Sequence, residues 1–158
     1  MEIERTGKAA EHYREAMIHS GCNELREAIA EYTKVIELLP NDAESYDSRG
    51  TCYLRLEQSE EAVEDYEKAI SLDPKNGGYY SSLFSAYLRL GENEKAAEAL
   101  EKAVKLNPKE AGMYYFSFGN NLLNSTGNKR EAALYFKKSV EHGDYDGYAK
   151  KKLAELGM

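Results

Sequence analysis

The sequence predicts an all-α fold in which antiparallel helical hairpins stack on one another. Three observations support this prediction. Apolar residues recur at the i, i+4, i+7 spacing of one helix face, as in Tyr46, Gly50 and Tyr53. Equivalent residues also recur every 34 positions along the chain. Finally, 42% of the 158 residues are hydrophobic and 31% are charged, a balance that suits a helical globular protein rather than a disordered chain.

One hairpin is clearest between residues 46 and 74. Its second apolar row, Ala62, Tyr66 and Ala69, has the same helical spacing as the first. Residues 56–59 lie between the rows and are only numerous enough to reverse the chain. The Asp-Pro pair that follows ends the second helix, because proline donates no N–H and crowds the preceding turn. Such a hairpin cannot bury both faces alone, so we expect copies of it on either side.

Four rows of residues share the 34-residue period, and this agreement indicates true internal repetition. Each row falls at one position of the hairpin, so the rows are independent of one another. They are Pro40, Pro74 and Pro108; Ala28, Ala62 and Ala96; Tyr32, Tyr66 and Leu100; and Val35, Ala69 and Ala103.

The period and the pattern resemble the tetratricopeptide repeat. The resemblance implies a right-handed superhelical stack, an α-α solenoid, with about four repeats and a C-terminal capping helix. A single domain, 1–158, is expected, with repeats at about 3–40, 41–74, 75–108 and 109–143 and the capping helix at 145–156. The matching residues are Tyr46, Gly50, Tyr53, Ala62, Tyr66, Ala69 and Pro74 in repeat two, and Tyr80, Leu83, Tyr87, Gly91, Ala96, Ala103 and Pro108 in repeat three.

The first hairpin departs most from this pattern. Its second helix, about 24–38, fits well, but the turn at 20–23 looks two residues longer than its counterparts. Its first helix, about 3–19, offers Ala9, Tyr13 and Ala16 in place of the aromatic-and-glycine row. A terminal repeat turns one face to water, so a weaker match is expected there.

Short polar residues are expected to cap the helices of repeats two and three. Asp42 is predicted to begin repeat two by accepting a backbone N–H, and Ser59 and Asn93 to cap the two second helices. Gly91 is predicted to end its helix in a left-handed conformation. Phe84 stands where close helix packing usually requires a small residue. Either small neighbours leave room for its ring, or the helix pair opens locally.

Repeat four is longer, because the interval from Ala96 to Ala132 is 36 residues. The extra residues fall in or before the turn at 124–129. Two registers fit its first helix, one placing Tyr114 and Phe118 on the packing face and the other Tyr115, Gly119 and Leu122. We favour the second, which restores the small residue of the family pattern. His142-Gly143 is expected to end the second helix of this repeat.

No pattern of residues indicates catalysis, a cofactor or a metal. Cys22 and Cys52 form no CxxC motif, and His12 and His19 are seven residues apart rather than the four of helical zinc sites. Serine-nucleophile and phosphate-loop motifs are absent from the sequence. We therefore expect no enzyme activity, no cofactor and no metal ion.

Charge and hydropathy also exclude several partners. The net charge is −7, which opposes binding to nucleic acid or anionic lipid. No stretch approaches the roughly 18 uncharged apolar residues of a membrane span. The amino terminus is charged from its second residue and resembles no secretion signal. These features predict a cytoplasmic protein that binds neither nucleic acid nor membrane.

The resemblance implies a concave groove, lined by the first helix of each hairpin, that takes a peptide. Hydroxyls and amides there suit hydrogen bonds to an extended backbone, and Arg55 and Arg89 suit a carboxylate. Alternatively, the serines only keep this surface narrow and hydrated. The candidate residues are Asp47, Ser48, Thr51, Arg55, Ser81, Ser82, Ser85, Arg89, Phe116, Asn120 and Asn124.

The carboxylate clamp of the chaperone co-factors in this family is not expected here. Lysines, asparagines and an arginine hold a peptide's terminal carboxylate in those proteins. The corresponding positions of this chain hold Tyr13, Met17, Ser48, Gly78 and Ser82. The sequence therefore does not predict binding of a chaperone tail.

These observations favour a protein–protein interaction scaffold that binds a peptide or helix of an unidentified partner in its groove. The alternative is a self-assembling structural scaffold, a homo-oligomer formed through the ends of the stack. A small-molecule pocket built from Tyr115, Phe116 and the neighbouring asparagines has only its composition in its favour.

Overall fold

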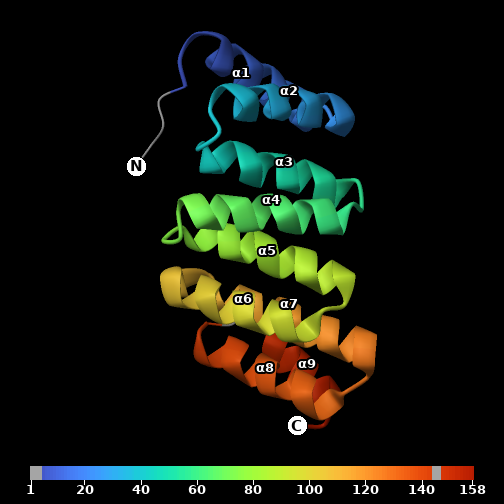
Figure 1. Ribbon diagram of the computed structural model, residues 1–158. Helices are drawn as coiled ribbons and strands as arrows, with labels where there is room; N and C mark the ends of the chain where they lie inside the picture. The colour runs from blue at the N-terminus through green and yellow to red at the C-terminus, as the bar shows by residue number, and fades with distance from the viewer. Residues whose placement is uncertain (1–4, 144–146) are drawn as a thin grey trace.

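The computed structural model describes residues 5–143 and 147–158, which form nine α-helices, one short 3-10 helix and no strand (Figure 1). The helices lie in a row from the N-terminus to the C-terminus, so the predicted all-α solenoid is confirmed. They are α1 (Gly7–Gly21), α2 (Leu25–Leu38), α3 (Ala43–Arg55), α4 (Ser59–Leu72), α5 (Gly77–Leu90), α6 (Asn93–Leu106), the 3-10 helix η1 (Pro108–Glu110), α7 (Ala111–Thr126), α8 (Lys129–Glu141) and α9 (Tyr148–Glu155).

Consecutive helices pair as hairpins, α1 with α2, α3 with α4, α5 with α6 and α7 with α8, and α9 packs on α8. The turns of the four hairpins share one conformation. Asn23, Glu57, Gly91 and Gly127 each adopt a left-handed φ between 63° and 72°. The predicted lengthening of the first turn is wrong, because residues 22–24 between α1 and α2 are as many as residues 56–58 between α3 and α4. The extra residues of repeat four lie before its turn, where α7 has 16 residues.

The helix starts differ from the sequence predictions. Helix α1 begins at Gly7 rather than near residue 3, and residues 145 and 146, the start of the predicted capping helix, lie outside the described residues. Ser59 and Asn93 are the first helical residues rather than caps. Asp42 does hold the N-cap position of α3, but its carboxylate accepts from the Ser45 hydroxyl at 2.6 Å instead of from a backbone N–H. Arg5 also donates a hydrogen bond to the Asp42 carboxylate.

Small and large side chains alternate where the helices of a hairpin cross. A Cβ atom on Gly50 would lie 2.9 Å from the ring of Tyr66, and one on Gly119 would lie 2.8 Å from the ring of Phe136. These contacts place Gly119 at the position of Gly50, which confirms the favoured register of α7. Close helix contact explains why glycine is needed at both positions.

A smaller neighbour leaves room for the ring of Phe84, as in the first sequence alternative, and the helix pair does not open as in the second. Its hairpin stays as closely packed as the others, so α5 and α6 do not open. In this repeat the smaller Leu100 replaces the tyrosine at position 66, and the ring of Phe84 contacts Tyr114 and Phe118 of α7, with centroids 6.4 and 5.9 Å away. Helix α6 meets α7 over a shorter stretch than α4 meets α5.

Of the tyrosines that match the repeat pattern, Tyr66 and Tyr87 are buried, whereas Tyr46, Tyr53 and Tyr80 are half-buried. Cys52 is buried and Cys22 is exposed, and neither forms a disulfide. None of the described helices has the length and apolar character that crossing a membrane requires.

Candidate partner-binding site

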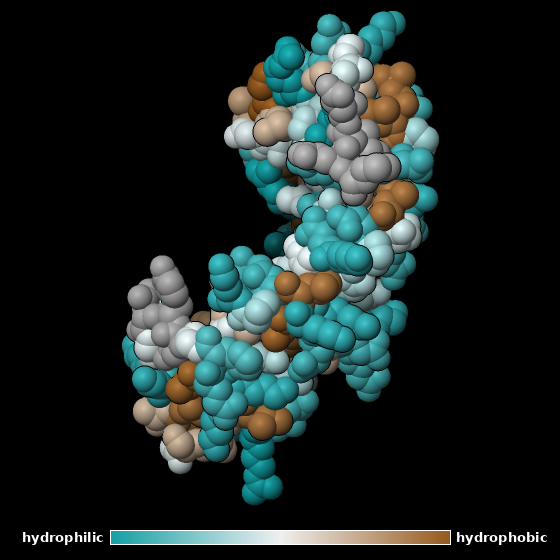
Figure 2. All heavy atoms as spheres, turned by 90° about the vertical axis from the view of Figure 1, so that its left-hand side faces the viewer, coloured by the Kyte–Doolittle hydropathy of each residue, from teal (hydrophilic) through white to brown (hydrophobic). Residues whose placement is uncertain are grey.

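The first helices of the hairpins form the inner side of the curved stack. Helix α3 touches α5, and α5 touches α7, whereas successive second helices in the described residues do not meet to the same extent. The outline in Figure 2 is hollowed on one side between the two halves of the molecule. We call the solvent-facing side of α1, α3, α5 and α7 the inner face.

Asp47 and Ser82 meet on the inner face, from α3 and α5. The Ser82 hydroxyl lies against the Asp47 carboxyl and favours its charged form, but burial has the larger effect and raises the pKa of Asp47. One carboxyl oxygen, Oδ1, is buried without a hydrogen-bond partner. Two candidate residues from adjacent repeats are thus brought together, and one oxygen of this half-buried carboxyl is left without a donor.

Ser48 and Thr51 lie beside tyrosine hydroxyls. Ser48 is half-buried between Tyr13 of α1 and Tyr32 of α2, and Thr51 Oγ1 lies 3.2 Å from the hydroxyl of Tyr66. Burial is the main reason why the pKa of the Tyr66 hydroxyl is raised, so it remains a neutral donor. These hydroxyls already have partners inside the protein.

Three serines on α5 continue the polar row. Ser81 lies against the hydroxyl of Tyr114 on α7, and Ser82 against Asp47 on α3. Ser85 donates to the Ser81 carbonyl at 3.0 Å within its own helix. Helix α5 therefore contacts both neighbouring first helices through hydroxyls, and the inner face is polar across three repeats.

The two candidate arginines have different environments. Arg55 donates to the Ser20 carbonyl at 3.1 Å and to Asn23 Oδ1 at 2.9 Å, which links α3 to the turn of the preceding hairpin. Arg89 is exposed in the last turn of α5 and has no ion-pair partner among the described residues. Of the two, only Arg89 has its whole guanidinium available for a partner.

The candidates on α7 are not equivalent either. The ring of Phe116 packs against Phe136 of α8 and Tyr148 of α9, with centroids 5.7 and 6.1 Å away. Asn120 is half-buried and Asn124 is exposed. The capping helix thus covers Phe116 from one side, and the amides continue the polar row.

Sequence reasoning missed a charged cluster at the N-terminal end of the inner face. Arg5 Nε lies 2.6 Å from Asp42 Oδ2, and Arg5 Nη2 lies 2.7 Å from Glu44 Oε2. The guanidinium also lies 3.8 Å above the ring of Tyr13, whose hydroxyl donates to Glu44. Arg5 precedes the first helix, and no periodic pattern could have placed it there.

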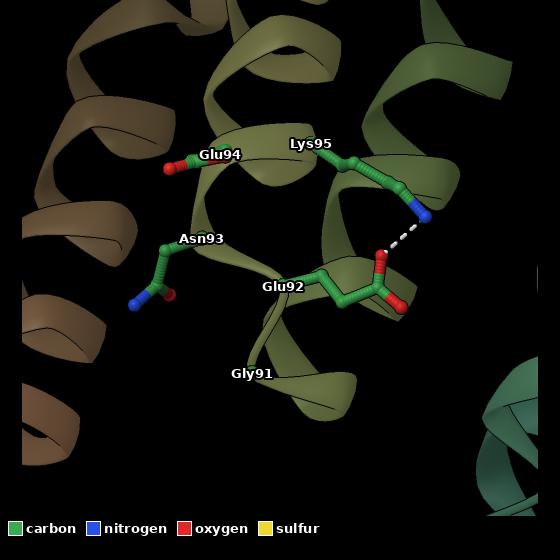
Figure 3. A pocket seen from close by; sticks show the side chains of 5 residues that line it. All are labelled: Gly91, Glu92, Asn93, Glu94 and Lys95. Atoms are coloured by element: carbon green, nitrogen blue, oxygen red, sulfur yellow. Dashed lines mark ion pairs between the residues drawn. The ribbon is translucent and has the colours of Figure 1, made fainter.

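Hollows elsewhere offer less. The one at the α5–α6 turn is lined by five consecutive residues, Gly91–Lys95, and Figure 3 shows Asn93 and Glu94 pointing away from the Glu92–Lys95 ion pair. Their polar groups do not converge. Another hollow lies between Tyr80, Tyr87 and Lys102. In the described residues, no group of three side chains is arranged to hold a metal ion.

Comparisons with known proteins agree with this architecture. Family models described as tetratricopeptide repeat match residues 4–42, 43–76 and 79–110. No curated protein matches the chain.

Several solved structures are similar. A crystal structure of the MamA protein has a TM-score of 0.81 at 22% identity, and the match covers 94% of this chain and 80% of the MamA chain. YrrB is described as a TPR protein with an unusual peptide-binding site. Its structure has a TM-score of 0.73 at 28% identity, and the match covers 94% of this chain and 75% of YrrB. The structure of the first TPR of Spaghetti (RPAP3), bound to the HSP90 peptide SRMEEVD, has a TM-score of 0.65 at 21% identity. The match covers 87% of this chain and 98% of that one.

Proposed function

Because the chain belongs to the tetratricopeptide repeat family, we propose that it is an interaction scaffold whose inner face holds an extended peptide or a helix of a partner protein. The observation that carries this proposal is the polar row across α3, α5 and α7, in which Asp47 keeps a buried oxygen without a partner. YrrB is described with a peptide-binding site and the first TPR of Spaghetti as bound to a peptide, and both descriptions support the proposal.

The proposed contact residues are those of the polar row. Asp47 and Ser82 are half-buried and Arg89 is exposed, so part of each residue faces solvent, and Asn120 and Asn124 extend the row along α7. Hydroxyl and amide groups can pair with the N–H and C=O groups of an extended segment. The remaining candidates, Ser48, Thr51, Arg55, Ser81, Ser85 and Phe116, make the internal contacts described above and would shape the surface.

The test is affinity capture from the source cell's lysate with three immobilised proteins. These are the wild type, an inner-face variant Ser85→Trp and an outer-face variant Glu64→Trp. Both variants add the same ring, and Glu64 is exposed on α4. We expect a protein that the wild type and Glu64→Trp recover and that Ser85→Trp does not.

A thermal unfolding profile of each variant accompanies the capture, since loss of fold would also abolish binding. Equal recovery by both tryptophan variants would contradict the inner-face proposal and move the site to the outer face or to the ends of the stack. Loss with Glu64→Trp alone would place the site on the outer face directly.

Self-assembly through the ends of the stack is a second candidate, favoured by two observations. Met17 and Ile18 are exposed on α1, and Leu134 and Tyr148 are exposed at the other end. The ends also differ in charge, with eight acidic and five basic residues in 1–38 and seven basic and five acidic residues in 129–158. Sedimentation at high and low salt tests this candidate, and a monomer under both conditions would remove it.

A further inference from the structure

We propose that the Asp47 carboxylate is a subsite for a basic side chain, lysine or arginine, of the partner segment. This inference rests on the proposed function and specifies the chemistry of the partner. It commits to a cation on a protein segment rather than to the carboxylate that the two arginines first suggested.

The first observation is the unpartnered oxygen of Asp47. Asp47 is half-buried, its Oδ1 atom is buried without a hydrogen-bond donor, and among the described residues Ser82 is the side chain that favours the charged carboxyl. An ionised carboxylate removed from water is costly unless donors or a cation compensate it. The groups around Asp47 compensate it only partly, and Glu44 adds a second negative charge nearby.

The second observation is that the adjacent junction already holds such a cation. Between α1 and α3, the guanidinium of Arg5 pairs with Asp42 and Glu44 and lies over the ring of Tyr13. The chain's own N-terminal segment thus shows that the acidic inner face binds a basic side chain. A guanidinium can engage a carboxylate and an aromatic face at the same time.

Repeat symmetry places Asp47 at the position that Tyr13, the ring under Arg5, has one hairpin earlier. Asp47 follows Tyr13 by 34 residues, but the residue 34 positions after Arg5 is Leu39, which carries no charge, and no described cation is recorded as acting on Asp47. Glu44 is likewise followed by Gly78, which is exposed. A Cβ atom on Gly78 would meet only the Asn76 side chain within 4 Å, so space is available there for a long side chain.

The carboxyl groups of Glu44 and Asp47 have pKa values shifted in opposite directions, as expected if only Glu44 has a cation beside it. Burial alone would raise the pKa of Glu44, but its bonds from Arg5 and Tyr13 outweigh burial and lower it. Burial likewise raises the pKa of Asp47, and there the single hydroxyl does not reverse the shift. A lysine or arginine beside Asp47 would supply the charge that Arg5 supplies to Glu44.

The experiment selects binders from a displayed library of random twelve-residue peptides on the immobilised full chain. Three proteins are compared: the wild type, Asp47→Asn and Glu64→Gln. Both substitutions remove one negative charge and keep the shape of the side chain, and Glu64 is exposed on α4. We expect the wild type and Glu64→Gln to enrich peptides with lysine or arginine at one fixed position, and Asp47→Asn to lose that preference.

Fluorescence anisotropy with the best enriched peptide then measures the pair directly. Replacing its basic residue by glutamine should weaken binding to the wild type about tenfold or more, and should change binding to Asp47→Asn much less. Ser85→Trp is included as the variant that blocks the inner face without touching the carboxylate. Unfolding profiles confirm that each variant is folded.

The possible failures are distinguishable. Peptides that bind the inner face without a basic preference, or with one that Asp47→Asn leaves unchanged, would overturn this inference and leave the scaffold proposal standing. If no peptide is enriched, or if Ser85→Trp binds every enriched peptide as well as the wild type does, both proposals are overturned.

Discussion

The two halves of the stack join their hairpins by different chemistry. In the N-terminal half, guanidinium groups cross from one hairpin to the next. Arg5 pairs with Asp42 and Glu44, and Arg55 donates to the turn of the first hairpin. Arg49 of α3 binds Asp65 of α4 through two bonds of 2.7 and 2.8 Å and also donates to Thr33 of α2.

In the C-terminal half, aromatic rings take over this role. Phe118 of α7 contacts Phe84 of α5 and Tyr135 of α8, with centroids 5.9 and 4.6 Å away. Phe116 bridges α8 and α9 in the same way. Lys138 and Glu101 do pair between α8 and α6, but both side chains are about a third or more exposed.

This difference suggests how each half responds to change. Ring contacts depend on shape, so the C-terminal half should be sensitive to lost volume and indifferent to pH. Charged links depend on the protonation of their carboxylates, so the N-terminal half should respond to acid and, where it is exposed, to salt. Four substitutions test this contrast, ordered by expected effect.

Phe118→Ala should have the largest effect, about 3–5 kcal/mol of lost unfolding free energy, because it leaves a cavity among buried rings. Urea unfolding measures the loss, and amide hydrogen exchange should show it concentrated in α5–α8. Leu134→Ala, at an exposed position of α8, is the control and should change little. A loss below about 1 kcal/mol for Phe118→Ala would contradict the packing role of the rings.

Arg49→Met should cost about 3 kcal/mol, since it leaves Asp65, only 5% exposed, without its counter-charge. The double variant Arg49→Met, Asp65→Leu should recover much of the loss, because it removes the isolated charge as well. Urea unfolding of the two variants beside the wild type gives both quantities. A double variant as unstable as the single one would show that Arg49 acts through packing rather than charge.

Arg5→Ala should cost about 1.5 kcal/mol at neutral pH, through its lost bonds to Asp42 and Glu44. The pKa of Glu44 is lowered by these bonds despite its burial, so its contribution is present above the ordinary carboxyl pKa and is lost as pH falls through the lowered one. The difference from the wild type should therefore shrink in acid. A difference independent of pH would rule out this electrostatic origin.

Asp47→Asn should have the smallest effect and the opposite sign, a gain of about 1 kcal/mol or less at neutral pH. Burial raises the pKa of Asp47, so the wild type bears a penalty above that pKa and sheds it as pH falls through it. The gain should consequently disappear in acid. Thermal unfolding at several pH values provides the measurement, and a loss of stability at neutral pH would mean that the carboxylate is compensated in the folded protein.

Some of the candidate site could be predicted from sequence, because repeat position fixes which helix face a residue lies on. Periodicity placed Asp47, Ser48, Ser81 and Ser82 on the first helices, where the structure brings them together across adjacent helices. It could not show that Arg55 binds the preceding turn, because the direction of a long side chain depends on acceptors that are distant in sequence.

The capping predictions failed for a related reason. Ser59 and Asn93 lie inside their helices, two positions after the left-handed residues Glu57 and Gly91, and the carboxylate of Asp42 is bonded to Arg5 and Ser45. Asn76 and Asn128 cap their helices instead, accepting from the backbone N–H groups of Gly78 and Glu131. The local sequence shows which residues are able to cap a helix, and tertiary contacts decide which of them do so.

The sequence by itself determined the repeat, because side-chain spacing along a helix and small residues at helix crossings follow from local geometry. The tertiary structure alone decided how the hairpins are joined. Ring contacts around Phe84 and guanidinium links such as Arg5 connect residues 30 or more positions apart. The unsatisfied oxygen of Asp47 likewise depends on which neighbours fold against it, because a buried acceptor is satisfied only by donors that the fold brings to it.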